Sequence, residues 1–295
     1  MKKLIASLLC AVGMLAVSTA QDLAGKKILF LGDSITQGGG YVSFIAYYLD
    51  RLNPDKDFDI YSLGLSSETT SGLSEASHMN HGFPRPCLHE RLDRVLKAVQ
   101  PEIVFALYGI NDGIYEPLDP IRTKAFQNGI LSLIDKCKKA GVKKIYLITP
   151  PIYDLTPAAG EFNYDTVMAA YAAWETTLKI KDVEVIDLHT VMRKARDASS
   201  ESFSKDKVHP GEAGHLLMAR TILSGLGVQV PDDPLAKIKA DPVYGLVAKR
   251  RSLRANAWLR YIGYTREKTV KTESVEKEET EAAELQKQIN ALRRK

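Results

Sequence analysis

The chain alternates short apolar runs with longer amphipathic stretches. The apolar runs predict buried strands at 27–31, 58–63, 103–108, 145–149 and 183–188. Residues with apolar side chains at helical spacing predict helices at 41–52, 89–99, 126–139, 166–178 and 211–223. This alternation is typical of repeated β-α-β units. We therefore expect a three-layer, flavodoxin-like α/β domain, residues 21–230, with a roughly five-stranded parallel sheet.

The first twenty residues have the pattern of a signal peptide. Lys2 and Lys3 precede an apolar run at 4–17, and small residues follow at 18–20. The run is short for a membrane-spanning helix, so an uncleaved anchor is the minority alternative. No other segment is apolar enough to span a bilayer. The sequence therefore predicts cleavage near Gln21 and a secreted or periplasmic protein.

The pattern also changes after residue 230, where a helical extension, residues 231–295, is expected. Residues 235–261 have a helical pattern that is broken at Asp241 and Pro242. Residues 276–294 are rich in Glu and Lys with few apolar positions. They predict either a solvated helix or a disordered tail, and the sequence does not separate the two.

Composition and charge narrow the class of protein. The 295 residues are 45% hydrophobic and 26% charged, which is ordinary for a soluble globular protein. The net charge is +4, to which Lys2 and Lys3 contribute two, and so small an excess does not favour nucleic acid as a partner. The oligomeric state stays open.

Two cysteines, Cys87 and Cys137, remain after the leader. An exported protein could pair them, but two cysteines are not a disulfide framework, and we favour two partly buried thiols. Neither belongs to a CxxC motif, so we expect no zinc site, no redox site and no cofactor.

The candidate chemistry begins with Ser34, which follows the first predicted strand. A serine hydroxyl needs a base to become a nucleophile. His209 is the natural base, and Asp206 precedes it by three residues in one short loop. An aspartate so placed can orient the imidazole and stabilise its charged form.

An attack on an acyl carbon also requires hydrogen-bond donors for the oxyanion. The candidates are the backbone N–H of Ser34, a backbone N–H from the turn between Gly64 and Ser67, and the side-chain amide of Asn111. Asn111 follows the third predicted strand and carries no charge.

Three segments, in this order, resemble the motifs of the SGNH/GDSL hydrolase (esterase) family: 32–36 (GDSIT), 109–112 (GIND) and 206–210 (DKVHP). The resemblance covers residues 26 to about 224. It implies that Ser34 is the nucleophile, His209 the base, Asp206 the group that orients it and Asn111 an oxyanion donor.

One further family block departs from the pattern. In place of an N-x-G-x-x-G stretch the chain has Ser62, Gly64 and Ser67 at the three defining positions. The alignment favours the backbone N–H of Ser67 as the remaining oxyanion donor, unless the turn requires a positive φ there.

The polar segment 77–86 is expected to line the pocket, with His81 and Arg85 as substrate contacts. His78 and His81 have a spacing that could bind a metal ion, but no clear further ligands accompany them. A surface loop without function is the plain alternative.

The sequence thus predicts a serine esterase that acts on short acyl groups, above all O-acetyl groups on a carbohydrate, through an acyl-enzyme. The resemblance to secreted carbohydrate esterases and the polar pocket loop favour this substrate class. A lipase or lysophospholipase is the enzymatic alternative, and a carbohydrate-binding module without turnover is the non-enzymatic one.

Overall fold

The protein is described by a computed structural model covering residues 20–78, 82–156 and 160–294. The predicted signal peptide therefore lies, apart from Ala20, outside the described residues. Five parallel strands form one sheet in the order β2-β1-β3-β4-β5. They are β1 (Lys27–Gly32), β2 (Asp59–Gly64), β3 (Ile103–Leu107), β4 (Lys144–Ile148) and β5 (Val183–Ile186). The predicted α/β class and strand number are confirmed.

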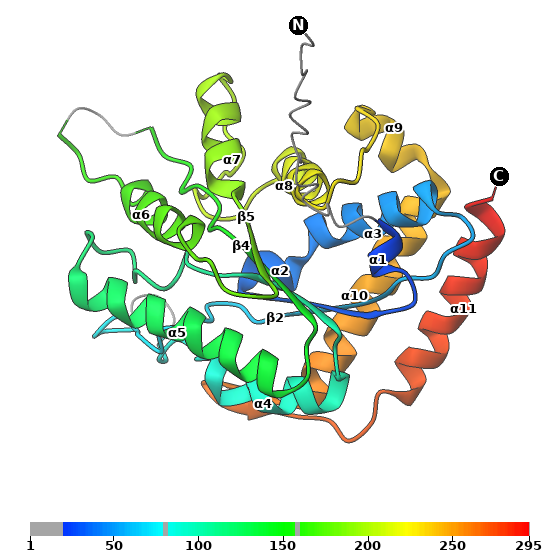
Figure 1. Cartoon of the computed structure of the whole chain (residues 1–295), viewed down its shortest axis with the longest axis horizontal. Coiled ribbons are helices and arrows are strands. Elements are labelled where there is room, and N and C mark those ends of the chain that lie inside the picture. The colour runs from blue at the N-terminus through cyan, green and yellow to red at the C-terminus, as the bar shows by residue number, and fades with distance from the viewer. Residues whose placement is uncertain (1–19, 79–81, 157–159, 295) are drawn as a thin grey trace, which may run out of the picture.

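Helices cover both faces of this sheet (Figure 1). The helices α3 (Gly40–Leu52) and α8 (Glu212–Gly225) pack against each other on one side, and α4 (Leu88–Val99) and α5 (Pro120–Lys139) do so on the other. The chain also forms α1 (Ala20–Leu23), α2 (Ser34–Gly38), α6 (Asp165–Thr176) and α7 (Leu188–Asp197).

Aromatic side chains hold the centre of the sheet together. Phe30, Phe105 and Tyr146 occupy matching positions on β1, β3 and β4. Their rings stack in one column, with centroids 4.6 and 4.7 Å apart. All three are buried, so this column fixes the register of the strands whose ends carry the candidate site.

Two predicted boundaries were wrong because capping residues were overlooked. The strand expected to reach residue 188 ends at Ile186, since Asp187 accepts the N–H of Thr190 and caps α7, a helix that was not predicted. The helix expected from residue 126 begins at Pro120. Asp119 caps it, and a proline suits the first helical position.

The extension forms α9 (Leu235–Ala240), α10 (Pro242–Ile262), β6 (Tyr264–Arg266), β7 (Lys268–Val270) and α11 (Glu276–Leu292). The break between α9 and α10 lies where the sequence predicted it, whereas the β6–β7 hairpin was not predicted. Because α10 packs against β2 and against α3 and α4, it covers the β2 edge of the sheet (Figure 1).

Of the two alternatives for the charged C-terminal segment, the helix is confirmed. Ala282, Leu285 and Ile289 of α11 are buried. Just beyond the helix, Arg293 donates hydrogen bonds to Asp50 at 2.7 Å and to Asp57 at 2.8 Å. The end of the described chain is therefore packed against the α/β domain.

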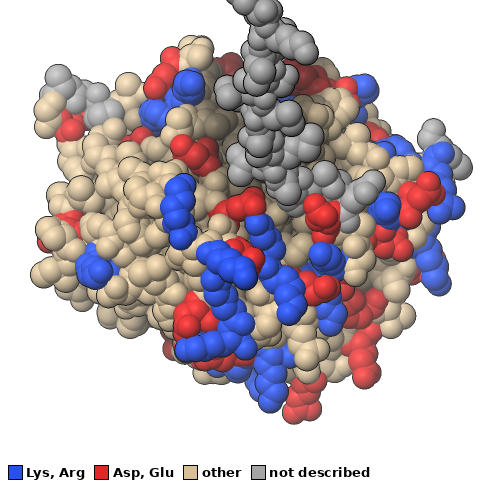
Figure 2. Space-filling model, in the orientation of Figure 1, with Lys and Arg blue, Asp and Glu red and all other residues tan. Residues whose placement is uncertain are grey.

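The surface carries charges of both signs. Lys and Arg side chains lie among Asp and Glu side chains over much of the face in Figure 2. Within the described part of the chain, no helix combines the length and apolar character needed to cross a membrane. Cys87 and Cys137 are both free thiols.

Candidate active site

Ser34 is the first residue of α2, which starts directly after β1. Asp33 caps this helix, because its Oδ1 accepts the N–H of Ile35 at 2.9 Å. The helix ends at Gly38 and is capped by Gly39, whose φ of 65° favours glycine. A Cβ at Gly32 would lie 2.1 Å from a side-chain oxygen of α2, so only glycine lets strand and helix meet. The turn presents Ser34 at the carboxyl end of the sheet, with an N–H that the helix does not use.

The structure brings Ser34, His209 and Asp206 together. The Ser34 hydroxyl oxygen lies 2.8 Å from His209 Nε2, and Asp206 Oδ2 lies 2.6 Å from His209 Nδ1. A carboxylate only accepts hydrogen bonds, so Nδ1 carries the proton and Nε2 accepts from the serine hydroxyl. The side chains of His209 and Asp206 are 51% and 56% exposed, which leaves the imidazole open to a substrate.

The loop itself keeps Asp206 charged. Its Oδ1 accepts the backbone N–H groups of Val208 at 3.0 Å and His209 at 2.8 Å. Partial desolvation raises the pKa of Asp206, but these bonds together with the His209 ring outweigh it and hold the pKa below its usual value. The Asp206 carboxylate is therefore ionised at the near-neutral pH at which a histidine can act as a base.

A buried aspartate anchors this loop from another element. Asp154, which follows β4, accepts the N–H groups of Phe203 and Ser204 through Oδ2. Arg196 donates to its Oδ1 at 2.6 Å, and the Asp154 N–H donates to the carbonyl of Lys207 at 2.8 Å. The loop that carries His209 is therefore held in place by Asp154, in the segment that follows β4 of the sheet.

Asn111 lies after β3 and is buried. Its Nδ2 donates to the carbonyl of Glu68 at 3.2 Å, while its Oδ1 accepts from Arg85 Nη1 at 3.0 Å and from the Tyr115 hydroxyl at 3.3 Å. These donors fix the orientation of the amide, since only its oxygen can accept them. One amide N–H remains for a ligand, because no other described residue accepts it.

Arg85 is 7% exposed and lies behind this amide. Its Nε and Nη2 donate to both carboxylate oxygens of Glu75 at 2.6 to 3.1 Å. The structure gives Arg85 contacts with Glu75 and Asn111, and its expected contact with substrate stays a prediction. His81, the other expected substrate contact, lies outside the described residues.

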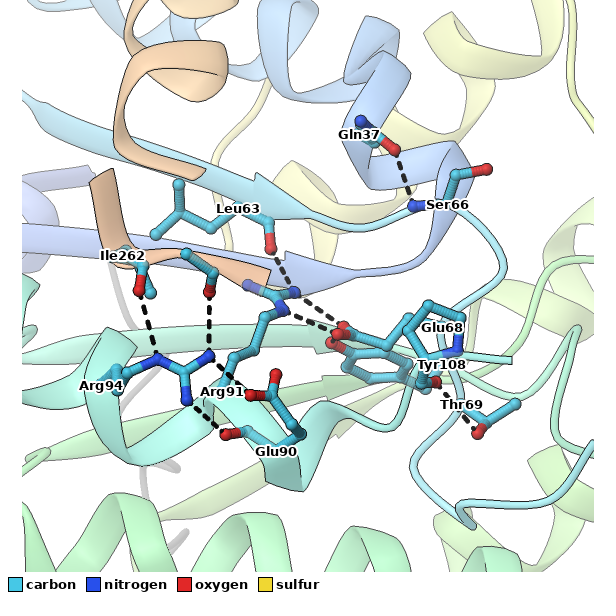
Figure 3. A network of polar contacts seen from close by, with 12 residues as sticks. Gln37, Leu63, Ser66, Glu68, Thr69, Glu90, Arg91, Arg94, Tyr108 and Ile262 are labelled. Atoms are coloured by element: carbon cyan, nitrogen blue, oxygen red, sulfur yellow. Dashed lines mark hydrogen bonds and ion pairs between the residues drawn. The ribbon is translucent and has the colours of Figure 1, made fainter. Parts of the chain in front are cut away.

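A second buried ion pair, between Glu68 and Arg91, lies beside the turn that follows β2 (Figure 3). Glu68 accepts hydrogen bonds from Arg91 at 2.6 and 2.7 Å and from the Tyr108 hydroxyl at 2.8 Å. Arg91 also donates to the carbonyl of Leu63 at 2.8 Å. Glu68 and Arg91 are fully buried, so the network ties the end of β2 to α4 and holds the Glu68 carbonyl that Asn111 contacts.

Ser67 has a φ of 66°, the left-handed conformation that favours glycine. Serine is about 1–2 kcal/mol less favourable there than glycine. Gly64 is required for a different reason, because its Cβ would lie 2.2 to 2.6 Å from backbone atoms of Asp33, Thr36 and Gln37. Gly64 thus permits close packing of β2 on α2. Because the turn does hold Ser67 at a positive φ, the condition under which the sequence favoured this donor is not met, and the oxyanion role of the Ser67 N–H stays an untested prediction.

Two further carboxyl groups lie beside the nucleophile turn. Asp112 Oδ1 accepts the N–H and hydroxyl of Thr70 and the N–H of Ser71, at 2.7 to 2.9 Å, and so holds that loop. Asp33 is buried, and its Oδ2 has no hydrogen-bond partner among the described residues. Desolvation, which outweighs the hydrogen bond from Ile35, raises the pKa of Asp33 to about 7.

The extension contacts the nucleophile helix directly. Arg251 of α10 donates to the carbonyl of Gly38 at 2.8 Å and to the hydroxyl of Ser43 at 3.0 Å. Its guanidinium fills the space that a Cβ at Gly39 would need. The end of α2 is therefore held by a residue more than two hundred positions away.

Sequence reasoning missed the two buried ion pairs and Arg251. One signal was available, because Arg91 falls on the apolar stripe of its helix, between Leu88, Leu92 and Val95. A charged residue at such a position requires a buried partner. Nothing in the sequence identified that partner. Among the described residues, no group of three or more His, Cys, Asp or Glu could hold a metal ion.

Comparison with known proteins gives consistent matches. The family model described as GDSL-like Lipase/Acylhydrolase matches residues 30–217. An acetylxylan esterase from Geobacillus stearothermophilus is 24% identical over 231 residues, which are 70% of this chain and 96% of that protein.

Solved structures show a similar fold. A mutant of Axe2, an acetyl-xylooligosaccharide esterase from the same Geobacillus, superposes with a TM-score of 0.55 at 23% identity, covering 72% of this chain and 98% of that one. An alpha/beta hydrolase from the metagenome of Lake Arreo superposes with a TM-score of 0.52 at 21% identity. The match covers 70% of this chain and 98% of that one. Residues 218–295 lie outside the family match.

Proposed function

Because the chain belongs to the GDSL-like lipase/acylhydrolase family, we propose that it is a serine esterase that removes short acyl groups, above all O-acetyl groups, from carbohydrates. The chain is an ester-bond hydrolase. The observation that carries the proposed chemistry is the chain of contacts from Ser34 to His209 to Asp206, at 2.8 and 2.6 Å. This is the arrangement that a histidine-activated hydroxyl requires.

In the proposed mechanism, Ser34 Oγ attacks the acyl carbon while His209 Nε2 takes the hydroxyl proton. The Ser34 N–H and the free N–H of Asn111 donate to the oxyanion, with the Ser67 N–H as the third candidate. His209 then returns the proton to the leaving alcohol. A water molecule, deprotonated by His209, hydrolyses the acyl-serine and releases the acid.

Two observations support an acetylated glycan as the substrate. The curated relative is named an acetylxylan esterase, and a structural neighbour an acetyl-xylooligosaccharide esterase. The described part of the polar loop 77–86 also lies next to Asn111, since Arg85 contacts its side chain. A lipase would be expected to offer an apolar groove for its acyl chain.

The decisive experiment is acetate release from acetylated xylo-oligosaccharides by wild type and Ser34→Ala. We expect release by wild type alone. Comparing nitrophenyl acetate with long-chain nitrophenyl esters distinguishes a short-acyl esterase from a lipase. A preference for the long-chain esters would rule out the short-acyl esterase. Failure of a fluorophosphonate to label Ser34 in folded protein would favour a carbohydrate-binding module without turnover.

We also propose that the protein is exported. Residues 1–20 support this, since a short basic start, an apolar run and small residues form a signal peptide pattern. Amino-terminal sequencing of the mature protein from the periplasm or medium tests it. A mature protein that begins at Met1 would contradict cleavage.

A further inference from the structure

The β6–β7 hairpin of the extension lies beside the turn that follows β2. A cavity of about 330 Å³ is lined by Ser66, Ser67 and Phe83 and by hairpin residues Tyr264, Arg266, Glu267, Lys268 and Val270. This volume is at the lower end of the range for small-molecule sites. The N–H of Ser66 donates to Gln37 Oε1 at 2.6 Å (Figure 3). The cavity therefore adjoins the helix that begins with Ser34.

The hairpin turns one of its two faces to this cavity. In its register Tyr264 pairs with Val270 and Arg266 pairs with Lys268, and these four residues line the cavity. Side chains alternate between the faces of a β-ribbon. The intervening residues Thr265 and Thr269 lie on the opposite face, where their hydroxyls are 3.3 Å apart. The face that meets the cavity thus carries both cations, and Glu267 at the turn lines the cavity beside them.

The two cations face each other, and Glu267 is the one acidic residue beside them among the described residues that line the cavity. Arg266 and Lys268 lie directly opposite each other, an arrangement that destabilises an isolated ribbon when the charges are alike. Within the described residues neither forms an ion pair, and Glu267, exposed at the turn, pairs with neither. An anion bound between them would remove this repulsion.

We propose that this cavity binds a saccharide unit that carries a carboxylate, next to the acylated unit. The inference rests on the proposed action on glycan esters. The planar guanidinium of Arg266 suits a carboxylate, with Lys268 as a second donor. Tyr264 and Phe83 provide aromatic surface for the sugar ring. The family match ends before the hairpin, so the cationic side of this subsite belongs to the extension, whereas Ser66, Ser67 and Phe83 lie within the matched region.

The test measures binding rather than turnover, and it uses the Ser34→Ala protein. Calorimetry compares a xylo-oligosaccharide that bears one glucuronic acid branch with its carboxyl-reduced form. We expect the acidic ligand to bind about 10- to 100-fold more tightly. The double change Arg266→Gln and Lys268→Gln should abolish this preference while changing the affinity for the reduced ligand less than about threefold.

Two matched controls separate the cations from general effects. Thr265→Val with Thr269→Val alters the opposite face of the same hairpin, and Lys249→Gln with Lys287→Gln removes two charges from α10 and α11. Both should retain the preference. Equal binding of the two ligands by Ser34→Ala, no binding of the acidic ligand, or an unchanged preference in the Arg266 and Lys268 variant would overturn the inference.

The proposed function can fail independently. If wild type releases no acetate from any acetylated glycan, the esterase proposal fails even where Ser34→Ala binds the acidic ligand as expected. If acetate is released but the acidic ligand has no advantage, only the hairpin subsite is refuted.

Discussion

Asp33, the residue before the proposed nucleophile, allows a quantitative test of the electrostatics of the turn. Its carboxyl group is buried, and burial raises its pKa from 3.8 to about 7. The folded protein therefore binds a proton at Asp33 more tightly than the unfolded chain does. The stability that this proton contributes is complete below the unfolded pKa and is lost as the pH rises through about 7.

The size of the effect follows from the shift. A change of about three pKa units corresponds to about 4 kcal/mol, at about 1.36 kcal/mol per unit. Asp33→Asn removes the titration but keeps an oxygen that can accept the Ile35 N–H. We expect the variant, relative to wild type, to gain up to about 4 kcal/mol in free energy of unfolding between about pH 4 and pH 8.

Urea unfolding of wild type and Asp33→Asn over this pH range measures the difference. Carboxyl groups far from Asp33 titrate in both proteins and cancel in the comparison, whereas Asp112 and Glu68, whose charges help to raise the pKa of Asp33, contribute to the measured difference. Asp119→Asn, at the partly exposed N-cap of α5, is the matched control for replacing a capping aspartate by asparagine. A stability difference between wild type and Asp33→Asn that stays constant with pH would refute the reasoning.

Three other changes test the contacts around the site. Asn111→Ala should lower kcat/KM for nitrophenyl acetate about 10²–10³-fold, as loss of an oxyanion donor does, and an unchanged value would remove Asn111 from the mechanism. Arg91→Met leaves the Glu68 carboxylate buried and unpaired, so urea unfolding should show a loss of about 3–5 kcal/mol; a loss below about 1 kcal/mol would contradict the buried pair. Arg251→Met removes the hydrogen bond to Gly38 and should lower the free energy of unfolding by about 1–3 kcal/mol, whereas equal stability would show that α2 does not depend on it.

The features predicted correctly from sequence were those with a local cause. β3 is a continuous apolar run, β1 and β4 are apolar after an initial lysine, and β2 keeps enough apolar residues around Ser62 to be detected. The alternation with helices implied the parallel sheet. Ser34, His209 and Asp206 were found because each lies at an element end within a short motif. The structure places them in contact, while their catalytic roles stay part of the proposal.

The features that were missed depend on distant contacts. Arg85 meets Asn111 because a loop folds back after β2, and Arg251 meets Gly38 because α10 lies along α3. Neither the path of a loop nor the packing of one helix on another produces a periodic pattern in the sequence from which these contacts could be predicted. The β6–β7 hairpin has three residues per strand, too few for alternation to stand out.

The position of the extension has a consequence for how the molecule folds. Arg293 donates to Asp50, Asp241 accepts from Arg51, and Arg251 holds the end of α2. The contacts of Asp241 and Arg251 cannot form before this part of the extension has been synthesised, and the contact of Arg293 must also wait for α11. Closing contacts between partners about two hundred residues apart slows folding. The region matched by the family model is thus shorter than the unit that folds. The helix that begins with Ser34 acquires its contact with Arg251 only after α10 has been synthesised.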